Sequence, residues 1–227
     1  MKRIIVLFFI SYLSNINAQI HEIGAFLGSS NYIGDIGPST YINPNETAFG
    51  LLYKWNRSPR HAWRFSYTKS KLAADDKNAD SKARKQRNFS FENSFQEVSA
   101  GLEFNFFKFD QHNFDKIFTP YVYSGLSYAR YDGLYFQDLN YPKKYKTQST
   151  ISIPMIVGVK TKFLDNWVFG AEIGARYSFK DNLDGSNPTD DKLSEYRFGN
   201  ISSNDWYVFS GFTITYTFGE RPCYCKN

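Results

Sequence analysis

A two-residue alternation of apolar and polar side chains recurs along this sequence and constrains the fold more than any other feature. Residues 167–179 show it clearly, because Phe169 and Ala171 alternate with Gly170 and Glu172. Side chains that alternate in this way lie on opposite faces of a β-strand. No segment shows a convincing helical period, so the sequence predicts an all-β protein.

The alternation defines eight segments of the chain. They cover residues 19–29, 46–56, 62–71, 94–108, 119–131, 148–162, 167–179 and 205–218. The fifth is the least regular, because Tyr121 and Tyr123 oppose Val122 and Leu126. Strands of about 10 to 15 residues are longer than the ~5–6 usual in soluble proteins, and they suit a tilted crossing of a bilayer.

The connections between these segments alternate in length. The long ones are residues 30–45, 72–93, 132–147 and 180–204, and the shorter ones are 57–61, 109–118 and 163–166. Transmembrane barrels have short periplasmic turns and long extracellular loops. An even number of strands then places both chain termini in the periplasm. The sequence therefore predicts an eight-stranded antiparallel transmembrane β-barrel of the outer membrane.

The aromatic content supports a membrane location. The chain has 22 Phe, 17 Tyr and 4 Trp, yet its mean hydropathy is −0.48. Such a chain must expose rings on one surface and stay polar elsewhere, as strands between lipid and a lumen do. We expect interfacial girdles of rings from the strand ends, formed by Trp55, Trp63, Trp167, Tyr177, Trp206 and Phe218.

The faces opposite the apolar ones carry charges of both signs. They are Glu22, Glu97, Glu103 and Glu172 with Lys54, Arg64, Lys160 and Arg176. Inside a narrow barrel these side chains could pair and fill the lumen, although simple solvation is the alternative. A soluble barrel or sandwich would show the same alternation with its apolar face turned inward. The long strands and the rings at their ends favour the membrane interpretation.

The first residues predict export. Lys2 and Arg3 precede the apolar residues 4–10, and Ala18 offers a small residue for signal peptidase. A retained anchor is the alternative, but the apolar run is shorter than the ~20 residues of a spanning helix. We therefore expect a signal peptide at residues 1–18, a barrel at 19–218 and a periplasmic tail at 219–227.

The sequence shows no catalytic apparatus. His21, His61 and His112 all fall at the expected periplasmic end, so none can serve as a base at the extracellular rim, where barrel enzymes usually have one. The net charge of +5, or +3 without Lys2 and Arg3, does not indicate nucleic acid. We predict no enzyme activity, no cofactor, no metal and no small-molecule substrate.

Two loop features have plain explanations. The acidic pairs Asp75–Asp76 and Asp190–Asp191 are expected to be solvated rather than to bind a cation. The basic residues between 71 and 87 would lie outside the cell near anionic lipopolysaccharide, where a hydrated loop is the favoured interpretation over lipid contact.

The C-terminal tail carries the two cysteines of the chain, in the segment Cys223, Tyr224, Cys225. In an oxidising periplasm they could form a strained local bridge, bind a metal or pair with another protein. A bridge across a single residue is geometrically poor. This segment is the candidate site for partner contact.

Several segments resemble the PorG family, outer-membrane components of the type IX secretion system of Bacteroidota. They are residues 22–36, 87–91, 103–107 and 216–218, followed by 222–224. The resemblance spans the mature chain and implies a role in protein secretion and gliding motility. It implies association with a periplasmic ring built from a lipoprotein and its partner, PorK and PorN. The contact surface would be the periplasmic turns and the tail, and the family supplies no catalytic or ligand-binding residue.

Two other functions remain open. A generic small barrel of the adhesin or membrane-stabilising type would act through its extracellular loops. A small-solute channel fits less well, because eight strands leave little lumen. In every case outer-membrane lipids surround the barrel.

Overall fold

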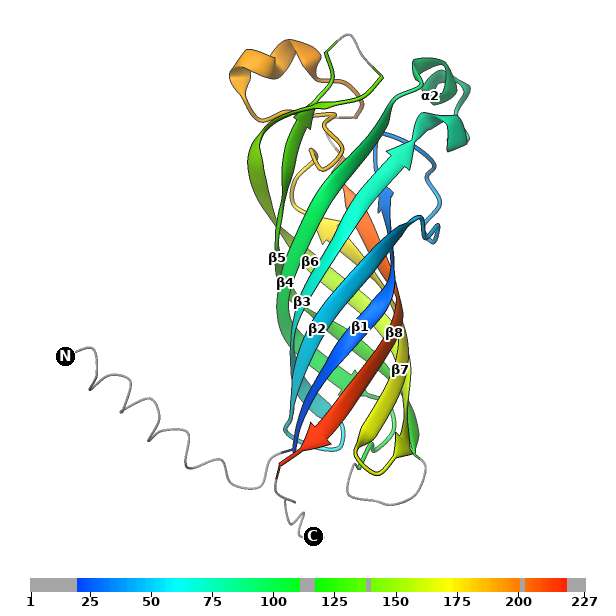
Figure 1. Ribbon diagram of the computed structural model, residues 1–227, viewed down its shortest axis with the longest axis vertical. Helices are drawn as coiled ribbons and strands as arrows, with labels where there is room; N and C mark the ends of the chain where they lie inside the picture. Colours follow the sequence, from blue (N-terminus) through cyan, green and yellow to red (C-terminus); the bar gives the residue numbers. More distant parts are fainter. Residues whose placement is uncertain (1–19, 111–116, 138–139, 201–202, 220–227) are drawn as a thin grey trace, which may run out of the picture.

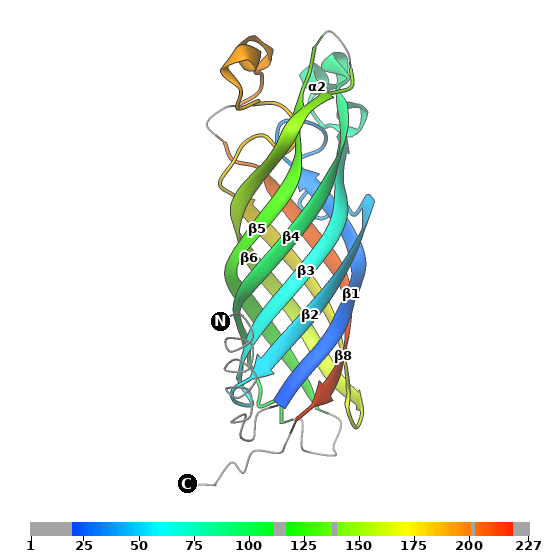
Figure 2. The same cartoon turned by 60° about the vertical axis from the view of Figure 1, so that its left-hand side comes forward.

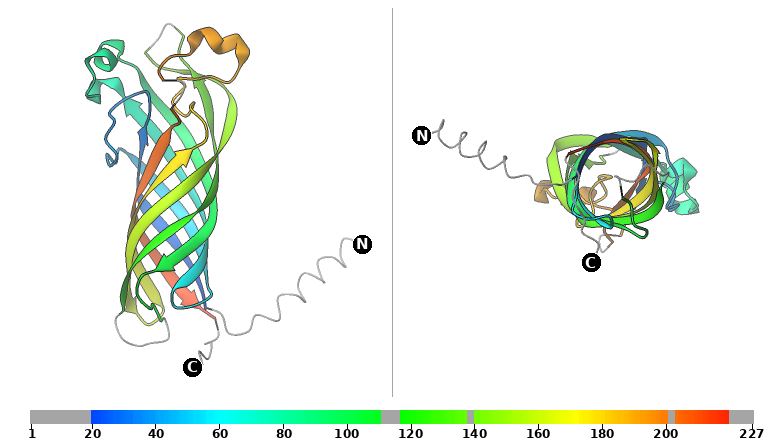
Figure 3. Two further views of the ribbon diagram at one scale, coloured as in Figure 1. Left: turned by 180° about the vertical axis from the view of Figure 1, so that it is seen from behind. Right: turned by 90° about the horizontal axis from the view of Figure 1, so that it is seen from below.

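The computed structural model describes residues 20–110, 117–137, 140–200 and 203–219. Eight strands within these residues form one closed antiparallel barrel, in which each strand pairs with its neighbours in sequence and β8 closes on β1 (Figure 1). The strands are β1 (Ile20–Ile33), β2 (Glu46–Asn56), β3 (His61–Asp75), β4 (Ser90–Asn105), β5 (Phe118–Tyr135), β6 (Lys143–Leu164), β7 (Trp167–Ser178) and β8 (Trp206–Phe218). Figure 3 shows the closed ring along its axis. The predicted fold class is confirmed.

The pairing register separates an apolar outer surface from a polar lumen. In β2 and β3, Trp55 lies opposite Trp63, and the next pair is Lys54 and Arg64. Because side chains alternate, a register that directs the two tryptophans outward directs the two cations inward. Lys54 and Arg64 are accordingly buried.

The outer surface is an apolar belt to which every strand contributes exposed side chains. They include Leu27, Leu51, Phe65, Val98, Leu126, Val157, Phe169 and Phe212, and Leu126 is 63% exposed. A soluble barrel would bury such residues inside, so the inverted arrangement is that of a transmembrane barrel. Trp63, Trp167 and Phe218 lie near the end of the barrel at which β1 begins, and Tyr177 packs on Trp206 at the opposite end with ring centroids 5.1 Å apart.

The two ends of the barrel differ. The end where β1 begins has tight connections, at residues 57–60 and 165–166; we call it the short-turn end. The opposite, long-loop end carries residues 34–45, 76–89, 136–142 and 179–205. These loops contain short helices: η2 (Asp76–Asn78), α2 (Lys82–Arg87) and η3 (Asp191–Tyr196). No helix in the described part of the chain combines the length and apolar character needed to span a membrane.

Strands β1 and β3 to β6 extend further at the long-loop end than predicted. Of these, β6 has 22 residues, and its outer part is seen in Figure 2. Above the belt, the outward positions are polar, as at Lys71 and Glu92, which form an exposed ion pair. The alternation that predicted the strands therefore disappears while the backbone ladder continues. Residues 1–19 and 220–227 lie outside the described residues, as does His112, so the predicted signal peptide and Cys223, Tyr224 and Cys225 stay predictions.

Candidate functional site

Near the short-turn end, the lumen is closed by a cluster of buried charges around Glu103 of β4. The Lys54 ammonium lies 2.8 Å from Oε2 of Glu103, and the Lys160 ammonium lies 2.5 Å from Oε1. The Arg64 guanidinium is more distant, with Nη1 3.7 Å from Oε2 of Glu103. All four side chains are almost completely inaccessible to solvent. The single Glu103 carboxylate therefore lies near three buried cations.

Arg64 links this cluster to β7 and completes the layer. Its guanidinium makes two hydrogen bonds to the Glu172 carboxylate, at 2.7 and 2.8 Å, a bidentate pair with fixed geometry. The Tyr121 hydroxyl donates to the same carboxylate at 2.5 Å. The layer thus joins side chains from six strands, β2 to β7, across the lumen.

A second layer lies closer to the long-loop end. Arg176 approaches Glu97 at 3.6 Å, and the Tyr207 hydroxyl donates to the same carboxylate at 2.6 Å. Phe95 and Phe209 pack on the Tyr207 ring, with centroids 4.6 and 5.6 Å away. The eight predicted lumen charges are therefore all buried, and side chains occupy the lumen in both layers. Pairing, the first of the two predicted alternatives, is confirmed.

The β7–β8 loop folds back into the mouth of the barrel at the long-loop end. Leu183 is completely buried, and its carbonyl accepts a hydrogen bond from Asn93 Nδ2 at 2.8 Å. The Tyr131 hydroxyl donates to Asn182, and the Leu183 amide donates to Asp205 Oδ2 at 2.8 Å. Side chains of β4 and β5 thus hold the first half of this loop in the barrel mouth. We call this part of the loop, around residues 181–186, the plug.

Four buried aspartates surround this plug: Asp35, Asp181, Asp184 and Asp205. Burial, together with the neighbouring carboxylates, raises the pKa of Asp181 to about 7. Burial is also the main reason that the pKa values of Asp184 and Asp205 are raised. No lysine or arginine in the described ranges forms an ion pair with any of the four.

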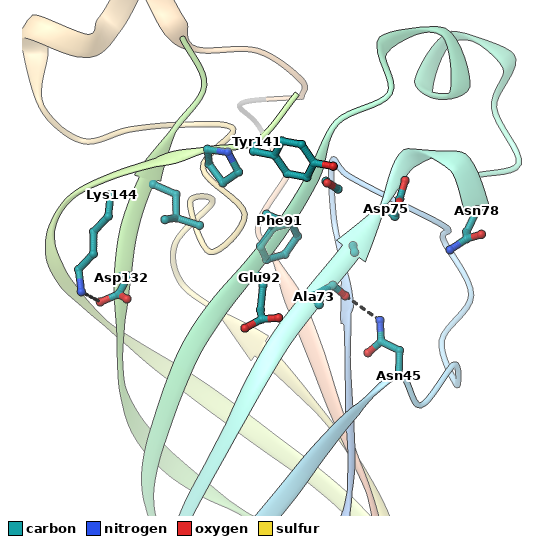
Figure 4. Close-up of a pocket in the computed structure, with 13 residues that line it drawn as sticks. Asn45, Ala73, Asp75, Asn78, Phe91, Glu92, Asp132, Tyr141 and Lys144 are labelled. Atoms are coloured by element: carbon teal, nitrogen blue, oxygen red, sulfur yellow. Dashed lines mark hydrogen bonds and ion pairs between the residues drawn. The ribbon is translucent and has the colours of Figure 1, made fainter. Parts of the chain in front are cut away.

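A groove of about 560 Å³ opens on the outer side of the same end (Figure 4). It lies where β4 and β5 separate, because their ladder ends at the pair Phe95 and Tyr131 while both strands continue outward. Beyond that point, the Asn93 side chain bonds both the amide and the carbonyl of Asp132, at 2.9 and 2.8 Å. Asn93 thus replaces the missing ladder and holds the two strands apart.

Figure 4 shows what surrounds the groove. The Tyr141 ring, 67% exposed, lies at its upper rim, and buried Phe91 lies below. Lys144 pairs with Asp132 on one side at 2.5 Å, and the Asn45 side chain bonds the Ala73 carbonyl on the other at 2.8 Å. The groove therefore offers an aromatic ring, carboxylates and amides on a preformed surface.

At the short-turn end, two connections are joined into a basic platform. The Phe109 amide donates to the Pro59 carbonyl at 2.9 Å, and Arg60 Nη1 donates to the Phe106 carbonyl at 2.9 Å. Arg57, Arg60 and Lys108 are exposed there, and Arg57 lies over the Trp55 ring at 5.0 Å. We call these three cations with exposed Phe106 and Phe107 the basic platform.

The acidic loop residues that were expected to be solvated differ in their burial and contacts. Asp76, expected to be solvated, is completely buried and accepts hydrogen bonds from the Gly37 amide at 2.9 Å and from Arg87 at 2.8 Å. That prediction was wrong, because α2 folds over the loop after β1 and needs an anchor. Asp75 and Asp190 instead cap η2 and η3.

The cations between residues 71 and 87 also divide into two groups. Arg84 donates to the Gly37 carbonyl at 2.8 Å, and Arg87 packs between the Phe89 and Phe198 rings. Lys82 and Lys85 are exposed. Only part of the basic run is therefore presented to the surroundings.

The two histidines in the described residues, His21 and His61, lie at the predicted end. His21 lies between the rings of Tyr53 and Phe218, and its Nδ1 is 2.7 Å from the Tyr53 hydroxyl. His61 Nδ1 lies 3.1 Å from Ser58 Oγ, but that oxygen also accepts from the Arg60 and His61 amides, as in a turn. Within the described residues, no three His, Cys, Asp or Glu side chains converge to hold a metal ion.

Sequence reasoning missed the aspartates around the plug. Residues 32–35 belong to the segment that carries the family resemblance, which implies no role for them, and Asp181 and Asp184 fall in the predicted connection 180–204. The available signal was Leu183, an apolar residue between Asn182 and Asp184 with Gly185 two positions later. In the structure, Gly185 has a φ of +88°. An apolar residue in that position favours a segment that turns inward.

Comparisons with known proteins found one matching family model and several similar solved structures. A family model described as a domain of unknown function, DUF6089, matches residues 1–227. No curated protein matches the chain. Ail, the attachment invasion locus protein of Yersinia pestis, is 12% identical with a TM-score of 0.48, over 88% of this chain and 99% of its own. Neisserial surface protein A is 13% identical with a TM-score of 0.48, and the match covers 88% of this chain and 95% of that protein. The N-terminal barrel of Pseudomonas aeruginosa OprF is 12% identical with a TM-score of 0.48, and the match covers 88% of this chain and 97% of that domain.

Proposed function

This chain belongs to the DUF6089 family, and from that premise we propose that it is a sealed outer-membrane barrel that acts as an anchoring and assembly component. The observation that carries the proposal is the paired lumen, in which Glu103 binds Lys54 and Lys160. A lumen filled by ion pairs leaves no route for solutes, so the working surfaces are the two ends.

Conductance tests the sealed state. The purified full-length barrel, reconstituted in planar bilayers, should show no stable open steps. A well-characterised porin in the same bilayers provides the positive control. Stable open steps with the unmodified chain would show that it is a channel and would reject the proposal.

More specifically, we propose that the chain is a component of the type IX secretion system and ties the periplasmic lipoprotein ring to the outer membrane. The support is the ordered resemblance to the PorG family in residues 22–36, 87–91 and 103–107 and near the C-terminus. In this orientation the short-turn end and both termini lie in the periplasm, and the long-loop end is extracellular.

The basic platform suits contact with an acidic surface of such a partner. Arg57 and Lys108 are exposed, and the backbone beneath them is held by the bonds of Phe109 and Arg60. Exposed arginine next to aromatic rings is common in protein interfaces. Cys223, Tyr224 and Cys225 would extend this surface, with a disulfide to the partner as one possibility.

Co-purification tests this role. In Arg57→Glu/Lys108→Glu, the ring lipoprotein should no longer co-purify with the solubilised barrel, and secretion should fall. The matched control is Lys82→Glu/Lys85→Glu, which reverses two exposed charges at the opposite end. Deletion of residues 219–227 should have the same effect as the platform variant. Retained co-purification and secretion in both variants would reject the assembly role.

The proposed disulfide has its own test. If the tail pairs with a partner, the complex should migrate as one band on a non-reducing gel and separate after Cys223→Ser/Cys225→Ser. An unchanged band pattern in the double variant would exclude the disulfide and leave the assembly role to the platform.

A second candidate function is surface binding through the extracellular loops, as in a small adhesin or membrane-stabilising barrel. The groove between β4 and β5 supports it, because Tyr141 and Asp132 are presented on a rigid rim. Under this function, Tyr141→Ala would change surface adhesion of intact cells while secretion stays normal. Normal adhesion in Tyr141→Ala would count against it.

A further inference from the structure

Asp184 and Asp205 bring two completely buried carboxyl groups together beside a single hydroxyl group. The Tyr32 hydroxyl donates to Asp205 Oδ1 and also approaches the Asp184 carboxyl group. Two of the other carboxyl oxygens accept hydrogen bonds from the loop backbone. Asp205 Oδ2 accepts from the Leu183 amide, and Asp184 Oδ1 accepts from the Ser186 amide, both at 2.8 Å. Asp184 Oδ2 is buried without a hydrogen-bond donor in the described structure.

The groups that face this pair come from every neighbouring segment. Tyr32 comes from β1, Asp35 from the loop after it, Tyr131 from β5 and Asp181 from the plug itself. All of them are acidic or phenolic.

Within the described residues, the side chains of the nearby basic residues do not pair with Asp184 or Asp205. Arg87 bonds other groups, and Lys180 contacts Asp205 through its backbone. Arg87 donates to the Asp35 carbonyl and pairs with the Asp76 carboxylate. The Lys180 backbone carbonyl accepts a hydrogen bond from the Asp205 amide at 3.3 Å. Two adjacent carboxylates in a buried site repel each other, and one of them then keeps a proton. With one proton between them, Asp184 can donate from the oxygen that otherwise has no partner.

We propose that Tyr32, Asp184 and Asp205 form a proton-dependent latch that holds the β7–β8 loop in the extracellular mouth and releases it when the shared proton is lost. The latch is independent of whether the barrel serves secretion or surface binding. Its release would also withdraw the Leu183 carbonyl from Asn93, the residue that holds β4 and β5 apart at the outer groove. The plug and the groove are therefore mechanically connected.

The test is amide hydrogen exchange of residues 182–186 in the full-length barrel, reconstituted in nanodiscs, from about pH 5 to about pH 9. Protection factors are corrected for the intrinsic pH dependence of exchange. A closed state that holds one more proton than the open state loses protection about tenfold for each pH unit, until the proton is also lost from the closed state. Protection should fall as the pH rises.

Asp184→Asn is the decisive variant. Its amide cannot ionise but can still donate a hydrogen bond, as the protonated acid can. The loss of protection should therefore become about tenfold smaller per pH unit, and protection at about pH 8 should exceed that of the unmodified chain. Asp191→Asn, exposed in the same loop, should behave like the unmodified chain. Tyr32→Phe should loosen the loop at every pH, with barrel folding verified by heat-modifiable gel mobility.

Three results would overturn the latch. One is an equal pH slope in Asp184→Asn and the unmodified chain. Another is full protection in Tyr32→Phe. The third is recovery of protection at about pH 8 on addition of millimolar Ca²⁺, which would show that a cation rather than a proton neutralises the pair.

Discussion

The lumen and the plug at the long-loop end each contain a set of four buried carboxylates, but the two sets are neutralised in opposite ways. In the lumen, Glu22, Glu97, Glu103 and Glu172 share the space with Lys54, Arg64, Lys160 and Arg176. In the mouth, Asp35, Asp181, Asp184 and Asp205 have hydrogen-bond donors and no ion pair among the described residues.

This difference separates a fixed structure from a responsive one. In the lumen, opposite charges are held 2.5 to 2.8 Å apart, so each buried carboxylate there has a cation as its direct partner or neighbour in the layer. Carboxyl groups buried beside one another depend on bound protons. The same barrel thus has a layer of ion pairs in its lumen and a proton-dependent plug at its long-loop end.

The largest expected effect comes from breaking the charge balance of the lumen. Glu103→Gln leaves Lys54 and Lys160 buried without their carboxylate, and should lower the free energy of unfolding by about 3–5 kcal/mol. Urea unfolding of the barrel in micelles measures it. Adding Lys160→Met to this variant should recover part of the loss, because it removes one unpaired cation. A double variant less stable than Glu103→Gln would contradict the explanation by charge.

A smaller, local effect should follow from Asp76→Ala. The substitution removes the acceptor for the Gly37 amide, the Phe89 amide and Arg87, so residues 76–89 should become accessible to protease, at a cost of about 1–3 kcal/mol. The barrel itself should unfold as before. Asp80→Asn, at an exposed position in the same loop, is the control. Unchanged proteolysis would show that α2 is held by other contacts.

Asp76 also shows where sequence reasoning ends. The strands could be predicted because the lipid belt imposes alternation residue by residue, as at Phe169 and Glu172, and the register follows from it. The lumen pairs followed from the same pattern. Asp76 and Asp184 are buried by loops that fold back on the barrel, and burial of that kind leaves no period in the sequence. The outer ends of β3 to β6 were missed for the related reason that Lys71 and Glu92 face water.

The pH dependence of the mouth can be divided between its aspartates. The pKa of Asp181 is raised to about 7, whereas that of a free aspartate is near 4, so the closed loop binds the additional proton. Its contribution to loop stability is complete below about pH 4 and is lost as the pH rises through about 7, by up to about tenfold in the closing equilibrium per unit. Asp181→Asn should remove the part of the slope below pH 7 and leave the part above it. Hydrogen exchange measures both. An unchanged slope below pH 7 would assign the titration to Asp184 and Asp205 alone.

The smallest effect is expected from the exposed pair that most resembles the lumen in geometry. The Lys71 ammonium lies 2.6 Å from Glu92, as close as the lumen pairs, but both side chains are more than half exposed. Water solvates each charge almost as well as the partner does, so Glu92→Gln should change the free energy of unfolding by no more than about 1 kcal/mol, and less in high salt. Urea unfolding beside Glu103→Gln makes the comparison direct. Equal losses in the two variants would show that distance decides the strength of these pairs, whereas a large loss only at Glu103 would show that burial does.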